Sequence, residues 1–264
     1  MTQDKAVLDI KIYPPEAQGV GQFDGGRITE IKPIGFPHEG PAIENLGPLF
    51  YWAWATAKGY GKIALHPHQA FEILSYALEG EIGHYDTLGH RSRVQAGGAQ
   101  VIQAGSGISH QEETIGDFTD FFQIWFDPDI RKALHKKPTY NEFKNDDFPI
   151  EVQTGVTLKT IIGEGSPVNL ESCILMKDIS IENQQQFAYT VQHEKTVAMV
   201  VISGTGKILD VHTGEKHSIN KQDFALIYAE QRGELIIQAD TDTPLRVAVI
   251  EVPAQVDYPL YRNR

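Results

Sequence analysis

Residues 66–80 decide the fold, and they read HPHQAFEILSYALEG. Two histidines stand two positions apart, and an apolar run with aromatic and aliphatic residues follows them and ends at Gly80. An apolar run of this length that ends at a glycine is typical of a β-strand. Side chains at positions i and i+2 of extended backbone point to the same face, so both imidazoles are predicted to share one side of a strand.

Short apolar runs separated by glycine-containing turns continue along most of the chain. This spacing is typical of a β-sandwich or barrel. No long stretch has helical periodicity, and the best helix candidate runs from an N-cap at Asp127 through His135, with Pro128 at the first helical position. The predicted strands are Phe71–Leu78, Gln100–Gln103, Phe121–Phe126, Val197–Ile202, Phe224–Ala229 and Arg246–Val252.

The two halves of the chain resemble each other. Residues 76–80 match residues 200–204 at an offset of 124, and residues 99–102 match residues 224–227 at an offset of 125. Solenoid repeats are only about 20 to 50 residues long, so a repeat of this length indicates a duplicated domain. We predict an N-terminal metal-binding domain over residues 1–135 and a C-terminal domain over residues 150–264, with a polar linker at about 128–149.

A second pair of possible ligands, His110 and Glu112, follows 42 residues after His68. If the two segments are neighbouring strands, His66, His68 and this second pair surround one cavity. Imidazole and carboxylate ligands suit a divalent first-row metal. Four further histidines lack such a partner pattern and are predicted to be structural: His38, His84, His90 and His135.

Composition excludes several classes of protein. The 264 residues include 23 Lys and Arg against 35 Asp and Glu, and the net charge of −12 predicts repulsion from nucleic acid. The longest apolar run, Leu49 to Ala55, is too short to span a membrane. The first residues lack the basic and apolar segments of a secretory signal, and a single cysteine, Cys173, favours a reducing cytoplasm.

The two histidine-containing segments resemble a known family. Residues 66–80 resemble the first cupin motif, and residues 98–112 resemble the second in the form that pirins use. Residues 121–128 resemble the strand and exit loop that follow it in pirins. Pirins are bicupins, so the resemblance implies an all-β fold of two tandem cupin barrels, also called double-stranded β-helices or jelly rolls.

The same resemblance implies a ligand set and a metal. The pirin ligands fall on His66, His68, His110 and Glu112, and the implied metal is Fe(II), with Mn, Ni, Co, Cu and Zn as alternatives. Glu72 stands where many other cupins place their carboxylate ligand, so the choice between Glu72 and Glu112 stays open at this point. If Glu72 is not a ligand, we expect it to accept a hydrogen bond from a ligand imidazole.

The rim and walls of the expected pocket differ modestly from the family pattern. Gln69-Ala70 stands where pirins often have Arg-Gly, and Gly98-Ala99 replaces a common Gly-Asp. Neither change removes a ligand, but each can alter the pocket rim. Candidate apolar walls, chosen by proximity in the sequence, are Phe71, Ile73, Phe122, Ile124 and Trp125.

The second half of the chain lacks the ligand residues. The offsets place Thr190, Gln192, Leu235 and Ile237 at the four ligand positions. If the gap in the alignment of the two halves is moved, His193 aligns with His68. At most one ligand survives, so the C-terminal barrel is predicted to bind no metal.

The resemblance implies quercetin 2,3-dioxygenase activity on a flavonol-like aromatic substrate with dioxygen. Glu112, helped by Glu72, would accept the proton of the substrate hydroxyl. An alternative is a non-enzymatic, metal-dependent redox regulator that binds a protein partner, which the acidic surface would suit. A cupin-type sugar isomerase ranks lower, because the sequence places no lysine near His110.

Overall fold

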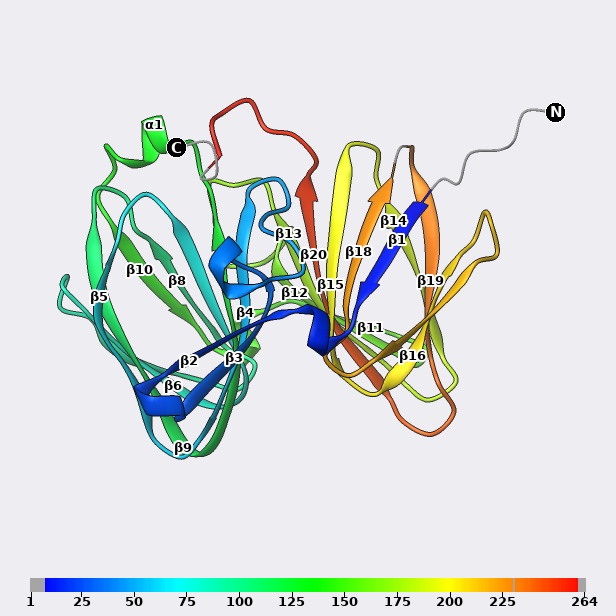
Figure 1. Cartoon of the computed structure of the whole chain (residues 1–264), viewed down its shortest axis with the longest axis horizontal. Coiled ribbons are helices and arrows are strands. Elements are labelled where there is room, and N and C mark those ends of the chain that lie inside the picture. The colour runs from blue at the N-terminus through cyan, green and yellow to red at the C-terminus, as the bar shows by residue number, and fades with distance from the viewer. Residues whose placement is uncertain (1–7, 230, 261–264) are drawn as a thin grey trace. The chain divides into compact units, whose positions relative to one another are not determined.

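The structure, a computed structural model, describes residues 8–229 and 231–260. Nearly all of its regular elements are antiparallel strands, and the chain divides into two compact units. We call the unit made of residues 17–148, 167–172 and 256–260 the first barrel. The second barrel comprises residues 8–16, 149–166, 173–229 and 231–255. In Figure 1 the strands of each unit curve around an interior of their own.

The first barrel is one sheet in the order β10-β8-β6-β9-β4-β3-β2, with β5 paired to β9 and β7 paired to β6. β6 and β9 are long enough to take part in both layers of the barrel. The strands are β2 (Gly19–Phe23), β3 (Ile28–Ile34), β4 (Leu49–Lys58), β5 (Gly61–His68), β6 (Glu72–Asp86), β7 (Arg91–Gln95), β8 (Ala99–Gln103), β9 (Ile108–Phe126) and β10 (Thr139–Phe143).

The second barrel has a seven-stranded sheet, β1-β18-β15-β20-β13-β12-β11, and a four-stranded sheet, β14-β19-β16-β17. Its strands are β1 (Leu8–Tyr13), β11 (Ile150–Gln153), β12 (Val156–Ile162), β13 (Leu175–Ile181), β14 (Gln186–Val191), β15 (Lys195–Ser203), β16 (Thr205–Asp210), β17 (Lys216–Asn220), β18 (Phe224–Ala229), β19 (Gly233–Ala239) and β20 (Leu245–Pro253). All six runs predicted as strands lie within or largely within strands, and the all-β prediction is confirmed.

Helical elements are few and short. They are η1 (Pro15–Ala17), η2 (Asp24–Gly26), η3 (Pro37–Glu39), α1 (Ile130–Ala133) and η4 (Asn145–Asp147). Within the described part of the chain, none is long and apolar enough to span a membrane.

The region predicted as a linker belongs to the first barrel. Helix α1 is shorter than predicted and begins after Asp129, whose carboxylate accepts a hydrogen bond from the Arg131 backbone N–H at 3.2 Å. That bond makes Asp129 the N-cap in place of Asp127. β10 then pairs with β8 over five residues, so residues 139–143 add a strand to the sheet.

The ends of the predicted domains also differ from the observed units. β1 pairs with β18 from Leu8 to Tyr13, which places the first described residues in the second barrel. Conversely, residues 167–172 and 256–260 lie in the first barrel. Part of each barrel therefore comes from the other half of the chain.

Matching bends in the two barrels support the internal duplication. Gly80 and Gly204 lie at corresponding places and have φ angles of 74° and 80°. A Cβ on Gly80 would lie 2.3 Å from the Phe118 carbonyl oxygen, and one on Gly204 would lie 2.1 Å from the Pro244 carbonyl oxygen. Both bends therefore require glycine.

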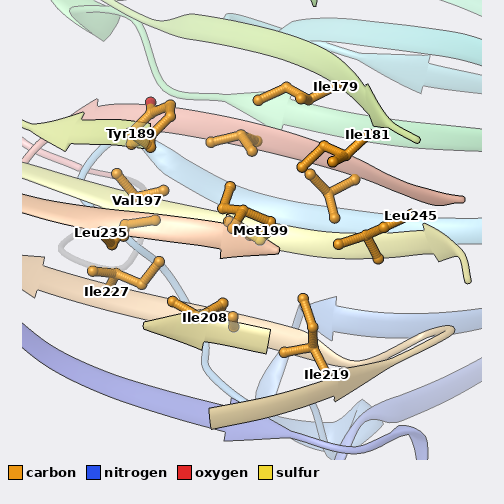
Figure 2. Close-up of a cluster of buried hydrophobic side chains, with 14 of the residues drawn as sticks. Ile179, Ile181, Tyr189, Val197, Met199, Ile208, Ile219, Ile227, Leu235 and Leu245 are labelled. Atoms are coloured by element: carbon orange, nitrogen blue, oxygen red, sulfur yellow. The ribbon is translucent and has the colours of Figure 1, made fainter. Parts of the chain in front are cut away.

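Aliphatic side chains fill the interior of the second barrel. Ile179, Met199, Leu235 and their neighbours point toward one another in Figure 2. Alternate residues of each strand face this core, as the period of a β-strand requires.

Candidate metal centre

Three imidazoles meet inside the first barrel. β5 pairs with β9 so that His66 lies directly opposite His110, and His68 lies two residues further along β5 on the same face. One ring nitrogen from each of the three histidines lies within 4.8 Å of the others. The ring centroids are 4.5 Å apart for His66 and His110, 4.8 Å for His66 and His68, and 5.0 Å for His68 and His110.

The nitrogens of this cluster fit a metal ion. Nε2 of His68 and both ring nitrogens of His110 are buried and have no hydrogen-bond partner. Nδ1 of His66 lies 2.8 Å from the Ala64 carbonyl oxygen, so it donates a hydrogen bond and leaves Nε2 free to accept. Buried polar atoms without partners are costly in a folded protein, and a bound cation would satisfy one nitrogen of His68 and one of His110.

Burial keeps the imidazoles of His68 and His110 neutral. It lowers the pKa of His68 to about 4, with a further contribution from His66. It lowers the pKa of His110 to about 2, with further contributions from the other histidines. Neutral imidazole is the form that binds metals, so these two residues need to lose no proton near pH 7.

Glu112 lies on the same face of β9 as His110, but its carboxylate is not part of the 4.8 Å cluster. Gln100 Nε2 donates to Oε1 at 3.0 Å, Gln123 Nε2 donates to Oε2 at 2.8 Å, and the Ser75 hydroxyl lies 3.1 Å from Oε1. Burial raises the pKa of Glu112 to about 7, although these three partners lower it.

Glu72 is buried away from the imidazoles. It stands three residues before Ser75 on β6, which places the two side chains on opposite faces of the strand. Its carboxylate accepts hydrogen bonds from the backbone N–H groups of Glu171 and Ser172 at 2.6 and 3.0 Å, and from Gln103 Nε2 at 2.8 Å. None of these partners is a histidine, so the expected bond from Glu72 to an imidazole is absent from its described contacts.

One histidine predicted as structural, His84, lies beside the cluster. The His84 ring centroid is 5.5 Å from that of His110, and its Nδ1 is buried without a hydrogen-bond partner. Its Nε2 lies 3.1 Å from Asp86 Oδ2, and His90 Nδ1 lies 2.9 Å from the same oxygen. His84 and Asp86 are two positions apart, like His66 and His68, and this spacing could have indicated their shared face.

Aromatic side chains border the cluster on one side. The Trp125 ring lies 4.9 Å from that of His68 in an edge-on arrangement, and Phe71 stacks on Trp125 at 6.0 Å. Ile73 packs in the same apolar cluster as Phe71 and Trp125. Phe122 and Ile124 alternate with Gln123 and Trp125 along β9 and therefore lie on its other face, where Phe122 contacts Trp52 and Trp54.

A lysine also lies within the first barrel, although the sequence placed none near the site. Lys32 Nζ forms ion pairs with Glu30 at 3.0 Å and Glu39 at 2.5 Å, and it lies 5.4 Å from the centroid of the Tyr51 ring. Tyr51 stacks on Trp125 with centroids 4.5 Å apart. Two carboxylates and the Tyr51 ring therefore already engage the Lys32 ammonium.

A cavity of about 510 Å³ opens beside His68. This volume lies within the range of about 300–1,000 Å³ that is usual for small-molecule sites. Apart from His68, no lining side chain carries an acidic or basic group. The lining residues are Pro67, His68, Gln69, Thr87, Gly107, Ile108 and Ser109.

The matching positions of the second barrel carry no such cluster. β14 pairs with β19 so that Tyr189 lies opposite Leu235, as His66 lies opposite His110 in the first barrel. Tyr189, Val191, Leu235 and Ile237 all belong to the buried apolar core. By strand pairing, the residues of β14 that correspond to His66 and His68 are Tyr189 and Val191. The sequence offsets predicted Thr190 and Gln192, which lie one residue further along. A one-residue slip in a strand reverses the face, so that prediction named residues on the wrong side of β14.

Comparisons with known proteins agree with this arrangement. The family model for pirin matches residues 55–126. Pirin-1 of Arabidopsis thaliana is 30% identical over 200 residues, which cover 66% of this chain and 68% of that protein.

Two solved structures share the fold. Quercetin 2,3-dioxygenase from Acinetobacter baumannii has a TM-score of 0.76 at 17% identity, covering 92% of this chain and 79% of that one. The bacterial pirin YhhW from Escherichia coli, in complex with nickel(II), has a TM-score of 0.74 at 22% identity, covering 93% and 99%. The predicted fold of two tandem cupin barrels is confirmed, and the chain belongs to the pirin family.

Proposed function

We propose that the protein is a metal-dependent dioxygenase that acts on a flavonol-like substrate at the first barrel. The observation that carries the proposal is the cluster of His66, His68 and His110, in which ring nitrogens of His68 and His110 are buried without other partners. The quercetin dioxygenase of Acinetobacter baumannii, which shares the fold, supports the reaction class.

The proposed metal is Fe(II), held by the three imidazoles with Glu112 as the carboxylate of the site. Several neutral nitrogen ligands and one carboxylate are the usual donors of non-haem iron oxygenases. A bound ferrous ion supplies Lewis acidity and one-electron chemistry toward dioxygen. The nickel(II) in the Escherichia coli structure shows that a pirin of this fold holds a divalent first-row metal.

Glu112 is the proposed proton acceptor for the substrate hydroxyl. A general base works best when its pKa lies near the operating pH, and burial raises the pKa of Glu112 to about 7. Gln100 and Gln123 hold the two carboxylate oxygens in place. Glu72 accepts hydrogen bonds from Glu171 and Ser172 on the other face of β6, so we assign the base to Glu112 alone.

The cavity beside His68 is the proposed entrance for the substrate. Its lining is polar but largely uncharged, and Phe71 and Trp125 lie nearby with their ring faces parallel. A flat, polyhydroxylated aromatic molecule suits both features, because its hydroxyls meet polar groups and its rings meet aromatic surface.

Metal analysis followed by an oxygen-dependent turnover assay tests the proposal. The protein is loaded with Fe(II) without oxygen, quercetin and air are added, and the flavonol absorbance band is followed. We expect turnover in the parent protein and none in His66→Ala. The matched control is His193→Ala, which removes an exposed histidine of the second barrel and should leave turnover unchanged.

Two results would contradict the proposal. One is a parent protein that takes up no first-row metal under reducing conditions. The other is an iron-loaded protein that turns over no flavonol, and that result would favour the metal-dependent regulator.

A further inference from the structure

Tyr140 lies between His84, which borders the three histidines, and Gln100, which binds Glu112. It lies on β10, opposite Ile102 of β8, and packs into the apolar cluster formed by Ile73, Ile102 and their neighbours. Its ring lies flat on that of His84, with the centroids 4.0 Å apart and the planes 10° apart. His84 is the histidine whose ring borders His110.

The hydroxyl of Tyr140 reaches the other side of the centre through Gln100. It donates to Gln100 Oε1 at 3.3 Å, and Gln100 Nε2 donates in turn to Glu112 Oε1 at 3.0 Å and to Ser75 Oγ at 3.1 Å. Gln100 is almost fully buried, so water cannot take over either end of its amide.

An amide group has one end that accepts hydrogen bonds and one end that donates them. When the Tyr140 hydroxyl occupies the accepting end of Gln100, the donating end faces Glu112. If the amide turned over, its carbonyl oxygen would face the carboxylate oxygen and repel it. The direction of the bond from Tyr140 therefore decides whether Gln100 stabilises Glu112 as an anion.

Tyr140 is well suited to remain a donor. Burial raises the pKa of its hydroxyl above the usual value, so the group keeps its proton at any physiological pH. Its one proton is shared between Gln100 Oε1 and the Glu142 carboxylate at the surface, both at 3.3 Å, and its oxygen can accept from the Ser92 hydroxyl.

We infer that Tyr140 is a positioning residue of the metal centre, which fixes the amide of Gln100 and through it the carboxylate of Glu112. The inference rests on the proposed function only in that it requires a metal at this site. Gln123, which donates to the second oxygen of Glu112, has no described contact with Tyr140. The proposed effect of Tyr140 therefore reaches Glu112 only through Gln100.

Cobalt(II) binding to the metal-free protein tests the inference without any substrate. Titration calorimetry gives the affinity, and the visible absorption of Co(II) reports the donor atoms around it. Tyr140→Phe keeps the ring on His84 and removes the hydroxyl. We expect about tenfold weaker binding, the lower end of what the loss of an outer-shell partner costs, together with a shifted Co(II) spectrum.

Glu142→Gln is the matched control. It changes another partner of the same hydroxyl, at the same distance, and leaves the bond to Gln100 in place. We expect the affinity and the Co(II) spectrum of the parent. The thermal unfolding midpoint of each metal-free variant verifies that the fold is retained.

A second pair of variants separates the path through Gln100 from the ring contact with His84. In a Gln100→Leu background the hydroxyl has no amide to orient, so adding Tyr140→Phe should cause no further loss of affinity. Equal losses in the two backgrounds would overturn the inference, as would Tyr140→Phe with the parent affinity and spectrum. A parent protein that binds no Co(II) would instead refute the proposed metal site itself.

Discussion

The two barrels share a fold and a duplicated sequence pattern, but their interiors are opposite in character. The second barrel is filled with aliphatic side chains, as Figure 2 shows. At the corresponding positions the first barrel gathers three imidazoles, of which His68 and His110 are buried, and next to them the buried carboxylate of Glu112. Burying polar atoms without partners lowers the free energy of unfolding, so the metal-free first barrel is destabilised in a way that the second barrel is not.

The contrast is sharpest at one pair of positions. His66 and His110 face each other in the first barrel where Tyr189 and Leu235 face each other in the second. The pairing is the same at these positions, although the β5–β9 ladder shifts register between Ile63 and His66 and the β14–β19 ladder does not. The difference teaches that this fold is stable with either filling, and that binding a metal depends on a few side chains facing inward.

The largest effect is expected from a cavity in the second barrel. Leu235→Ala removes a fully buried side chain from the apolar core and should lower the free energy of unfolding by about 2–5 kcal/mol. Urea unfolding of the metal-free protein measures this loss. The Co(II) affinity of the folded variant should equal that of the parent. A large change in affinity would contradict the assignment of metal binding to the first barrel alone.

Copying the second barrel into the first should have the opposite effect on stability. His110→Leu places the residue of the matching position, Leu235, where two ring nitrogens lack partners. We expect metal affinity to fall more than about a hundredfold, beyond the loss typical of outer-shell residues. The metal-free protein should gain about 1–3 kcal/mol in its free energy of unfolding. A variant that lost stability would show that the histidine packs better than its unpartnered nitrogens suggest.

Acid should weaken the first barrel of the metal-free protein. The unfolded chain takes up protons on its histidines near pH 6.5, whereas in the folded state the pKa of His68 is about 4 and that of His110 about 2. Stability therefore falls as the pH drops below 6.5. Each histidine contributes up to about 2 kcal/mol of loss between pH 6.5 and 5.

Glu112 acts in the other direction over the same range. Its pKa of about 7 lies above the unfolded value, so the folded state holds a proton that the unfolded state has released, and stability rises as the pH falls toward 4.5. The expected net loss from pH 6.5 to 5 is about 2 kcal/mol, measured by urea unfolding. The loss of unfolding free energy caused by Leu235→Ala should be the same at both pH values. A loss that depended on pH would contradict the view that the titrating groups belong to the first barrel.

The smallest effect is expected at the counterpart of His66. Tyr189→Phe removes a hydroxyl that lies 3.5 Å from Glu251 Oε2, which is a long hydrogen bond. We expect a loss below about 1 kcal/mol and an unchanged Co(II) affinity. A larger loss would indicate that this polar contact is important to the second barrel.

The local pattern of the sequence was enough to predict the fold class and the meeting of the three histidines. Alternation along a strand is a local property, and it places His66 and His68 on one face. The same rule cannot be extended to Glu72, because Ala70 has a φ of 71° and turns the chain between β5 and β6. Counting by twos from His68 therefore fails beyond this turn.

The remaining parts of the centre depend on register between distant strands. Ser75, Gln100 and Gln123 reach Glu112 from three other places in the sequence, and no local pattern marks them. Tyr140 was assigned to a linker because the residues around it are polar and charged. β10 is an edge strand, and one inward-facing aromatic residue was too weak a signal to predict it.

The exchange of segments between the halves has a consequence for how the protein can be divided. A cut near residue 149 would give one fragment without residues 167–172, whose backbone amides bind Glu72, and another without β1. Neither fragment would hold a complete barrel, although the boundary looks natural in the sequence. The duplicated halves are no longer interchangeable modules, and we expect them to be inherited, expressed and recombined only as one piece.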